Sequence, residues 1–262
     1  MLKLENVRKT FNSGTVNEKV ALDGLNLTLN DGDFVTVIGG NGAGKSTMLN
    51  AISGSFFIDE GTIRIDDKDI TRLPEHKRAK FLGRVFQDPM MGTCADMWIE
   101  ENMALANRRG QARGLAWSIS SKERTKFREL LAELDLGLEN RLSTKVGLLS
   151  GGQRQALTLL MATMKQPQLL LLDEHTAALD PKTAAKVLSL SRKFVEEGHL
   201  TTLMVTHNMK DAIAYGNRLI MMNSGKIIFD ACGEEKKNLT VDMLMKKFSE
   251  SGAELNDRAV LS

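Results

Sequence analysis

The stretch FVTVIGGNGAGKSTMLNAI, residues 34–52, decides the fold. It opens on a continuous apolar run, 34–38, which is typical of a strand covered on both faces. The loop that follows fits the pattern G-x-x-x-x-G-K-[ST] at its four defined places, Gly39, Gly44, Lys45 and Ser46. Apolar residues at helical spacing come next and predict a helix. A strand, a glycine-rich loop and a helix in this order predict a site for a nucleoside triphosphate.

Each part of this loop has a chemical reason. Glycines let the backbone N–H groups wrap the phosphates, and the start of the helix directs its positive end at the β-phosphate. Lys45 adds a full charge at the β- and γ-phosphates, the Ser46 hydroxyl can ligate Mg²⁺, and Thr47 can contact the α-phosphate. The ATP-binding residues that we expect here are Gly39, Asn41, Gly42, Ala43, Gly44, Lys45, Ser46 and Thr47.

Outward from this loop, two strand patterns alternate with helical ones. Continuous apolar runs recur at 169–172 and 203–205, and each is followed by a loop and a helical pattern, which predicts a parallel α/β core. Alternating runs at 2–7, 25–29 and 62–66 predict antiparallel strands instead.

The middle of the chain differs from this core. Residues 88–165 are poor in strand patterns and hold helical patterns near 97–107 and 122–135, so they predict an inserted helical subdomain. Residues 218–231 predict a hairpin, and 240–249 a helix. We therefore expect one domain over 1–249, divided into a core (1–87 and 166–231), a helical subdomain (88–165) and a C-terminal helix (232–249), with a polar tail at 250–262.

Composition sets limits on the function. The 35 basic and 33 acidic residues leave a net charge of +2, so no strong field attracts nucleic acid, and we expect no nucleic-acid partner. The N-terminus lacks the apolar stretch of a secretory signal, and no apolar run approaches the roughly 18 residues that a membrane span needs. If the chain serves a membrane process, the spanning part is expected on another polypeptide.

Two further sequence strings narrow the class of nucleotide-binding protein. LSGGQ stands at 149–153, where Ser150 and Gln153 have the spacing of a capping box, and LLLLDE stands at 169–174. With the loop at 39–47, these strings resemble the ATP-binding cassette (ABC) family, the ATPase subunits of ABC transporters, over nearly the whole chain. The resemblance implies an α/β fold with a parallel-sheet core like that of P-loop NTPases, an N-terminal antiparallel β subdomain and an inserted α-helical subdomain.

The resemblance also assigns catalytic roles. Asp173 leaves a predicted strand in position to hold Mg²⁺, and Glu174 beside it is the candidate general base that polarises the attacking water. His207, in VTHN, resembles the switch histidine that contacts the γ-phosphate. Gln87, in VFQDP, resembles the Q-loop glutamine, which meets Mg²⁺ and the water while its loop senses the transmembrane partner. With Lys45, these residues complete the expected catalytic set.

Some assignments leave alternatives open. Phe11 stands where the family has an aromatic residue that stacks on adenine, with Val20 flanking the ring, but a core phenylalanine is the rival interpretation. Asp180 matches the D-loop at the dimer interface, or caps the next helix, or does both. His175 stands where the family usually has proline, and we expect a solvated loop histidine. A basic segment comprises Arg108, Arg109, Arg113 and Trp117. We expect a solvated loop there, ahead of a contact with a partner or with membrane headgroups, and last of a contact with nucleic acid.

In the family, two cassettes pack head-to-tail. The LSGGQ string of each cassette, called the signature, then covers the ATP held by the other cassette. The residues implied to contact ATP of the opposite subunit are Ser150, Gly151, Gly152, Gln153 and Asp180. ATP then holds a homodimer closed, and hydrolysis lets it open. The implied partners are integral-membrane permease subunits and, in an import system, a solute-binding protein. The chain itself is expected at the cytoplasmic face of a bacterial-type cell membrane.

The block around Phe11 and the glycine loop most resembles ATPase subunits that pair with branched-chain amino acid-type permeases, which favours import of an amino acid or a related small solute. Nothing in an ATPase site reads the cargo, so the cargo and the permease stay open. The alternative is a soluble ABC ATPase without a permease, of the kind that serves iron–sulfur assembly.

Overall fold

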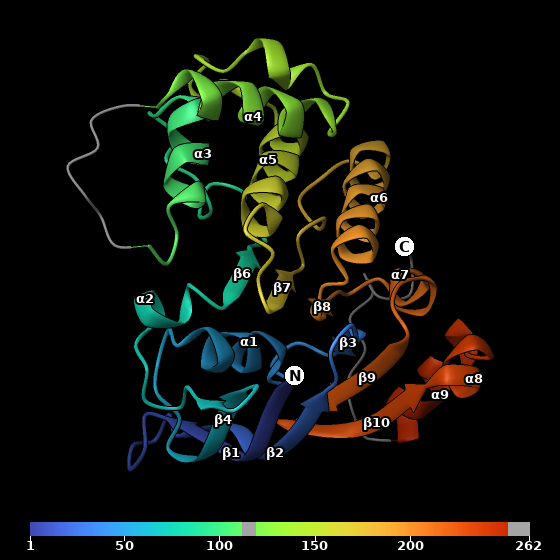
Figure 1. The fold of residues 1–262 in the computed structure, drawn as a ribbon. Helices are drawn as coiled ribbons and strands as arrows, with labels where there is room; N and C mark the ends of the chain where they lie inside the picture. The colour runs from blue at the N-terminus through green and yellow to red at the C-terminus, as the bar shows by residue number, and fades with distance from the viewer. Residues whose placement is uncertain (112–118, 251–262) are drawn as a thin grey trace.

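Two β-sheets organise the chain in the computed structural model, which describes residues 1–111 and 119–250 (Figure 1). A six-stranded sheet has the order β10-β9-β3-β8-β7-β6, and a four-stranded sheet has the order β2-β1-β4-β5. The strands are β1 (Leu2–Phe11), β2 (Lys19–Leu29), β3 (Phe34–Gly39), β4 (Glu60–Ile65), β5 (Lys68–Asp69), β6 (Leu82–Val85), β7 (Leu169–Asp173), β8 (Thr202–Val205), β9 (Arg218–Asn223) and β10 (Lys226–Cys232).

The helices cover these sheets and form a separate group at one end. They are α1 (Lys45–Ser53), α2 (Glu75–Arg78), α3 (Ile99–Asn107), α4 (Ser121–Ala132), α5 (Gly151–Thr163), α6 (Pro181–Gly198), α7 (Met209–Ala214), α8 (Gly233–Lys237) and α9 (Val241–Glu250). Two short 3₁₀ helices, Leu138–Asn140 and Val146–Leu148, precede α5.

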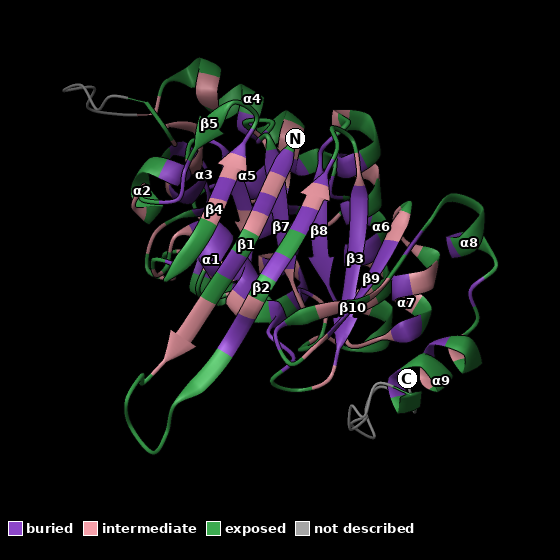
Figure 2. Cartoon of the chain, turned by 90° about the horizontal axis from the view of Figure 1, so that it is seen from below, coloured by how far each residue is buried: buried purple, intermediate pink, exposed green. Residues whose placement is uncertain are grey.

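The six-stranded sheet is parallel except at one edge, as the continuous apolar runs predict. β3 pairs in parallel with β8 and β9, β7 with β8, and β6 with β7, while β10 returns antiparallel to β9. All residues of β3 and β8 are buried (Figure 2), which is why their sequences are apolar on both faces. The predicted hairpin at 218–231 is confirmed by β9 and β10.

The second sheet is antiparallel and alternates in burial. Leu2 and Leu4 of β1 are buried while Lys3 between them is not, and β1 pairs antiparallel with both β2 and β4. The strands are longer than predicted, because the pairing of β1 with β2 continues as far as Phe11 opposite Lys19. The predicted fold class, a parallel core with an antiparallel β part and inserted helices, is confirmed.

Helices α3, α4 and α5 form the group that stands apart from the sheets in Figure 1. Their predicted ranges are close to the observed ones. α4 ends at Ala132 instead of continuing to residue 135, because Asp135 takes a left-handed conformation with φ 53°. α5 begins with the predicted capping box, since Ser150 Oγ accepts from Gln153 N and Gln153 Oε1 accepts from Ser150 N, both at 3.2 Å.

The apolar core has three parts. One lies around α1 between the two sheets, a second joins α3, α4 and α5 to the opposite face of β7 and to α6, and a third packs α7 and α9 on β9. The segment 232–249, expected to hold one C-terminal helix, contains two, because residues 238–240 separate α8 from α9. Within the two described ranges, none of the helices combines the length and apolar character that a bilayer crossing requires.

Candidate active site

The glycine loop lies at the carboxyl end of β3, directly before α1. Gly44 precedes the helix with φ 102°, and a Cβ there would stand 2.7 Å from the Ala21 carbonyl oxygen. A Cβ on Gly39 would stand 2.5 Å from the Met222 carbonyl oxygen. Both positions therefore need glycine, for conformation or for space.

This loop borders a pocket of about 300 Å³ that has basic groups beside the helix start. The pocket suits a phosphate chain, because backbone N–H groups at a helix start and two lysines offer positive charge from several directions. Its lining residues are Lys19, Ala21, Asn41, Gly42, Ala43, Gly44, Lys45, Ser46, Thr47, Glu174 and His207. The structure thus brings most of the predicted loop together with the predicted base and switch histidine.

Lys45 is held inside the loop. Its Nζ donates to the carbonyl oxygens of Gly39 at 2.7 Å and Gly40 at 3.1 Å, and the residue is 5% exposed. Burial lowers the pKa of Lys45, and the carboxylates of Glu174 and Asp173 oppose that effect. The ammonium group is thus partly desolvated, which strengthens its attraction for an anion.

Asp173 ends β7 and is fixed by an arginine that the sequence analysis did not single out. Its Oδ2 lies 3.1 Å from Arg84 Nη2, and Arg84 also donates to Asn50 and Ser53 of α1. Burial raises the pKa of Asp173, and the bond from Arg84 counters that effect. The carboxylate therefore has a fixed direction beside the loop.

Glu174 and His207 are in direct contact. Glu174 Oε1 lies 2.5 Å from His207 Nε2, and the Glu174 side chain is 10% exposed. Glu174 has φ 46°, a conformation that non-glycine residues seldom adopt, and its backbone N–H donates to the Val205 carbonyl at 3.0 Å. The neighbouring strands β7 and β8 thus deliver the two side chains to the same end of the sheet.

Gln87 follows β6 at that same end but lies outside the pocket. Val85 pairs with Leu172, so the loop after β6 starts beside Asp173. The Phe86 carbonyl accepts from Gln155 Nε2 at 3.1 Å, which ties this loop to α5, while Gln87 itself is exposed. Gln87 stands two residues after β6, and its predicted contact with Mg²⁺ stays a prediction.

The signature residues lie away from the pocket of their own chain. Ser150 and Gly151 are exposed at the start of α5, whereas Gly152 is buried against α6. A Cβ on Gly152 would stand 2.0 Å from Thr183 Cγ2, so this glycine is required for the two helices to approach. Asp180 caps α6, because its Oδ1 accepts from Thr183 N at 3.1 Å, which confirms the capping role.

Comparison with known proteins settles the class. The family model described as "ABC transporter" matches residues 22–177. A tyrosine transport ATP-binding protein of Clostridioides difficile (strain R20291) is 45% identical over 95% of this chain and 98% of its own. The chain belongs to the ABC transporter family. A phosphonates import ATP-binding protein of Lactococcus lactis subsp. lactis (strain IL1403) is 30% identical, over 94% of this ABC chain and 99% of its own.

Solved structures give the same answer for the fold. The dimeric post-hydrolysis state of the ATP-binding cassette MJ0796, bound to ADP and Pi, has a TM-score of 0.75 and 33% identity, covering 88% of this chain and 98% of that one. The ADP conformation of the cassette MJ1267 has a TM-score of 0.77 and 28% identity, covering 95% and 98%. This ABC chain is therefore an ATP hydrolase of the cassette type.

The two predicted adenine contacts of this ABC ATPase do not line the phosphate pocket themselves, but Phe11 pairs with Lys19 and Val20 lies between Lys19 and Ala21, which do. Phe11, at the end of β1, packs edge-to-face on Phe56 with 5.3 Å between ring centroids, and Lys9 Nζ lies 5.5 Å from its centroid. Val20 is 38% exposed at the start of β2. Phe56 packs on the core, so Phe11 has a partner of its own, and its stacking on adenine stays a prediction.

The expectation for His175 is wrong. We expected a solvated loop histidine, but the residue is 2% exposed, and its Nε2 lies 2.9 Å from Ser191 Oγ of α6. Burial lowers the pKa of His175 to about 4. The turn after Glu174 folds inward, toward α6, and carries the imidazole with it.

Of the basic segment, Arg113 and Trp117 lie outside the described residues. Arg108 pairs with Glu123 at 3.1 Å, and Arg109 donates to the Ala162 carbonyl at 3.0 Å. Sequence reasoning missed Arg84 and Lys19 as site residues, since Arg84 stands in the short strand β6 and Lys19 is the first residue of β2, where no motif marks it. Only the strand order brings Arg84 to Asp173 and Lys19 to the loop.

Proposed function

We propose that this chain is the ATP-hydrolysing subunit of a membrane importer for an amino acid or a related small solute. The observation that carries the proposal is the likeness to the tyrosine transport protein, which extends over nearly all of both chains. The phosphonates relative, named as an import protein, supports the direction of transport. The subunit would act at the cytoplasmic face of the membrane, bound to permease subunits.

Hydrolysis would use the contact between Glu174, after β7, and His207, after β8. Glu174 borders the phosphate pocket, so its carboxylate can take a proton from a water that attacks the γ-phosphate. His207, which touches Glu174, would orient that water and contact the γ-phosphate. Lys45 would balance charge on the β- and γ-phosphates, and Gln87 would join from the loop after β6.

The donors near the loop fit a magnesium ion. Ser46, Asp173 and Gln87 offer hydroxyl, carboxylate and amide oxygens, which hard cations prefer. In residues 1–111 and 119–250 there is no cluster of three or more His, Cys, Asp or Glu side chains suited to a metal, which agrees with Mg²⁺ held by few protein ligands together with phosphate oxygens. Bound Mg²⁺ would neutralise charge on the phosphates.

Two copies would close on two ATP molecules. Ser150 and Gly151 stand exposed at the start of α5, where backbone N–H groups and the helix dipole favour a phosphate. None of the signature residues lines the chain's own pocket, so a second copy would supply the phosphate. The dimer named for the cassette MJ0796 supports this arrangement. Gln153 and the exposed Asp180 would contact the partner's ATP as well, while the buried Gly152 would keep α5 close to α6.

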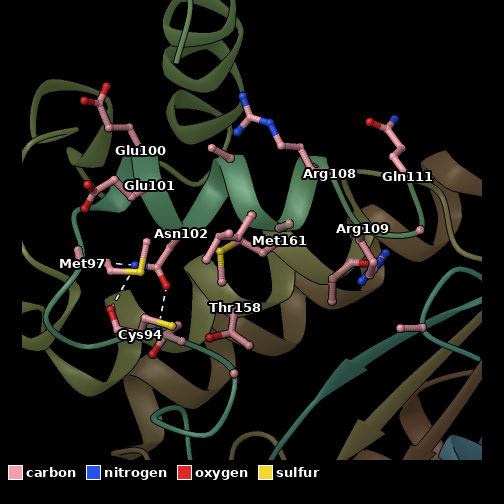
Figure 3. A pocket seen from close by; sticks show the side chains of 18 of the residues that line it. Cys94, Met97, Glu100, Glu101, Asn102, Arg108, Arg109, Gln111, Thr158 and Met161 are labelled. Carbon is pink, nitrogen blue, oxygen red and sulfur yellow. Dashed lines mark hydrogen bonds between the residues drawn. The ribbon is translucent and has the colours of Figure 1, made fainter. Parts of the chain in front are cut away.

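A groove between the helical group and the core would receive the permease. It has a volume of about 1470 Å³ and is bordered by exposed apolar side chains, among them Met91 (68% exposed), Leu105 (47%) and Trp98 (43%). The Asn102 side chain fixes one wall of the groove (Figure 3). Its Oδ1 accepts from Cys94 N, and its Nδ2 donates to the carbonyl oxygens of Cys94, Met97 and Trp98. An amphipathic helix suits such a groove.

Arg109 indicates which charge the permease segment that enters the groove should carry. Arg108 and Arg109 point in opposite directions in Figure 3, and Arg109 lines the groove. Burial alone lowers the pKa of Arg109, and within the described part of the chain no carboxylate lies at ion-pair distance from it. A permease segment with an Asp or Glu beside its apolar face would complete the guanidinium's hydrogen bonds.

Uptake measurements test the proposal. Cells that lack this chain would receive either the wild type or Glu174→Gln, and uptake of labelled tyrosine and other amino acids would be compared, with the exposed Glu129→Gln as the matched control. We expect the wild type and the control to restore uptake of one amino acid and Glu174→Gln to restore none. Equal uptake of all amino acids in every strain would contradict amino-acid import.

A further inference from the structure

The turn between β7 and α6 carries Glu174 at one end and Asp180 at the other. It is built under constraint: Glu174 has φ 46°, its carbonyl accepts from Ala177 N at 2.9 Å, and the Thr176 carbonyl accepts from Leu179 N at 3.1 Å. A left-handed non-glycine residue persists only where its surroundings determine it fully. This chain lacks the proline that would stiffen position 175, so another contact must hold the turn.

The His175 side chain supplies that contact. His175 and Ser191 are 2% and 1% exposed, and His175 Nε2 lies 2.9 Å from Ser191 Oγ. Ser191 Oγ also lies 2.9 Å from the Val187 carbonyl oxygen, which can only accept. Because a hydroxyl has one hydrogen, Ser191 donates to Val187 and must accept from His175, so the proton of this bond resides on Nε2.

The bond fastens the turn to the middle of α6. Ser191 lies roughly 15 Å along the helix from its first residue, Pro181. α6 in turn contacts the signature helix closely where Gly152 meets Thr183. One continuous set of contacts therefore runs from the signature of α5, through α6, to the residue beside Glu174.

We propose that His175 is a positioning residue for Glu174, whose bond to Ser191 keeps the turn after β7 in the conformation that directs the Glu174 carboxylate to His207 and the phosphate pocket. His175 itself touches no reacting atom. This inference rests on the proposed role of Glu174 as the general base. It assigns a function to the histidine that replaces proline, and it makes Ser191 the second half of the device.

Steady-state ATP hydrolysis by the purified full chain tests the inference. His175→Leu fills the buried space but removes the N–H donor, and Ser191→Ala removes the acceptor. His175→Gln keeps an N–H donor at similar reach. We expect kcat to fall roughly tenfold to a hundredfold in the first two variants, as for a misplaced catalytic group, while KM for ATP changes less than about twofold. His175→Gln should recover most of kcat, and the double variant should be no worse than the weaker single one.

Other outcomes overturn the inference. Unchanged kcat in His175→Leu would show that Glu174 needs no such support. Additive losses in the double variant, or kcat and melting temperature falling together in all variants including His175→Gln, would show a purely structural histidine. The Glu174→Gln variant tests the general base by itself. If that variant hydrolysed ATP at the wild-type rate, Glu174 would not be the general base, whatever the His175 variants show.

Discussion

The phosphate pocket and the groove under the helical group are built in opposite ways. The pocket is local, since one loop between β3 and α1 supplies most of its lining, and only Lys19, Ala21, Glu174 and His207 come from elsewhere. The groove combines α2, β6 and the loop after it, α3, α4 and α5, which are far apart in the sequence. A local site can be read from a motif, whereas a composite surface exists only after folding. Except at Arg84, which lines the groove and also bonds Asp173, mutations in the two regions should therefore have separate effects.

The largest expected effect lies in the pocket. Glu174→Gln removes the proposed base but keeps the size of the side chain, so ATP hydrolysis should fall by roughly 10²–10⁴-fold while ATP binding persists. Phosphate release and size-exclusion chromatography with ATP would show an inactive chain that accumulates as a dimer. Hydrolysis at the wild-type rate would contradict the assignment. The groove should be unaffected, and membrane partners should still co-purify.

Lys45→Ala should weaken ATP binding. The buried Lys45 ammonium faces the pocket, and a hydrogen bond to a charged group contributes about 1.5–3 kcal/mol, so the Kd for ATP should rise about ten- to a hundredfold. Titration with a fluorescent ATP analogue measures this change. The exposed Lys126→Ala serves as the control. Unaltered affinity in Lys45→Ala would mean that the pocket does not hold the phosphates.

Gly152→Ala affects α5, which lines the groove and packs against α6. A Cβ would stand 2.0 Å from Thr183 Cγ2, and overpacking costs about 1–3 kcal/mol, so the melting temperature should fall by roughly 2–10 °C. Gly151→Ala is the matched control, because its Cβ would meet only Leu179 Cδ2 at 3.6 Å. If both variants melted like the wild type, the close contact of α5 and α6 would be wrong.

Arg109→Glu should weaken binding at the groove. Losing a charge-assisted bond of about 1.5 kcal/mol should lower recovery of the membrane partner about tenfold, while hydrolysis by the isolated chain stays at the wild-type level. Quantitative mass spectrometry after affinity purification measures recovery. Arg128→Glu, an exposed arginine on α4, makes the same change of charge away from the groove. Equal recovery from both variants would remove Arg109 from the docking surface.

Sequence patterns predicted the fold best where one strand or one helix end determined the outcome. The apolar runs at 34–38, 169–172 and 203–205 became β3, β7 and β8, and the Ser150 capping box begins α5 as predicted. β6 was missed, because Gly83 interrupts its apolar pattern. That glycine has a tertiary cause: a Cβ there would stand 2.6 Å from the Ala162 carbonyl oxygen of α5.

The site was predictable to the same degree. Motif spacing placed Lys45, Glu174 and His207 in one pocket, but the direct Glu174–His207 contact depends on the register of β7 and β8. The burial of His175 was not predictable, because Ser191 is the one polar residue among the buried positions of α6 and meets the turn only through packing. Long-range pairs of this kind leave no local pattern.

Isolation of the tagged chain from gently solubilised membranes of its own cell tests the central claim most directly. We predict that mass spectrometry finds a polytopic membrane protein bound to it, and a solute-binding protein would point to the cargo. Recovery with soluble assembly factors alone would contradict the transport account and favour an ATPase that remodels a protein assembly.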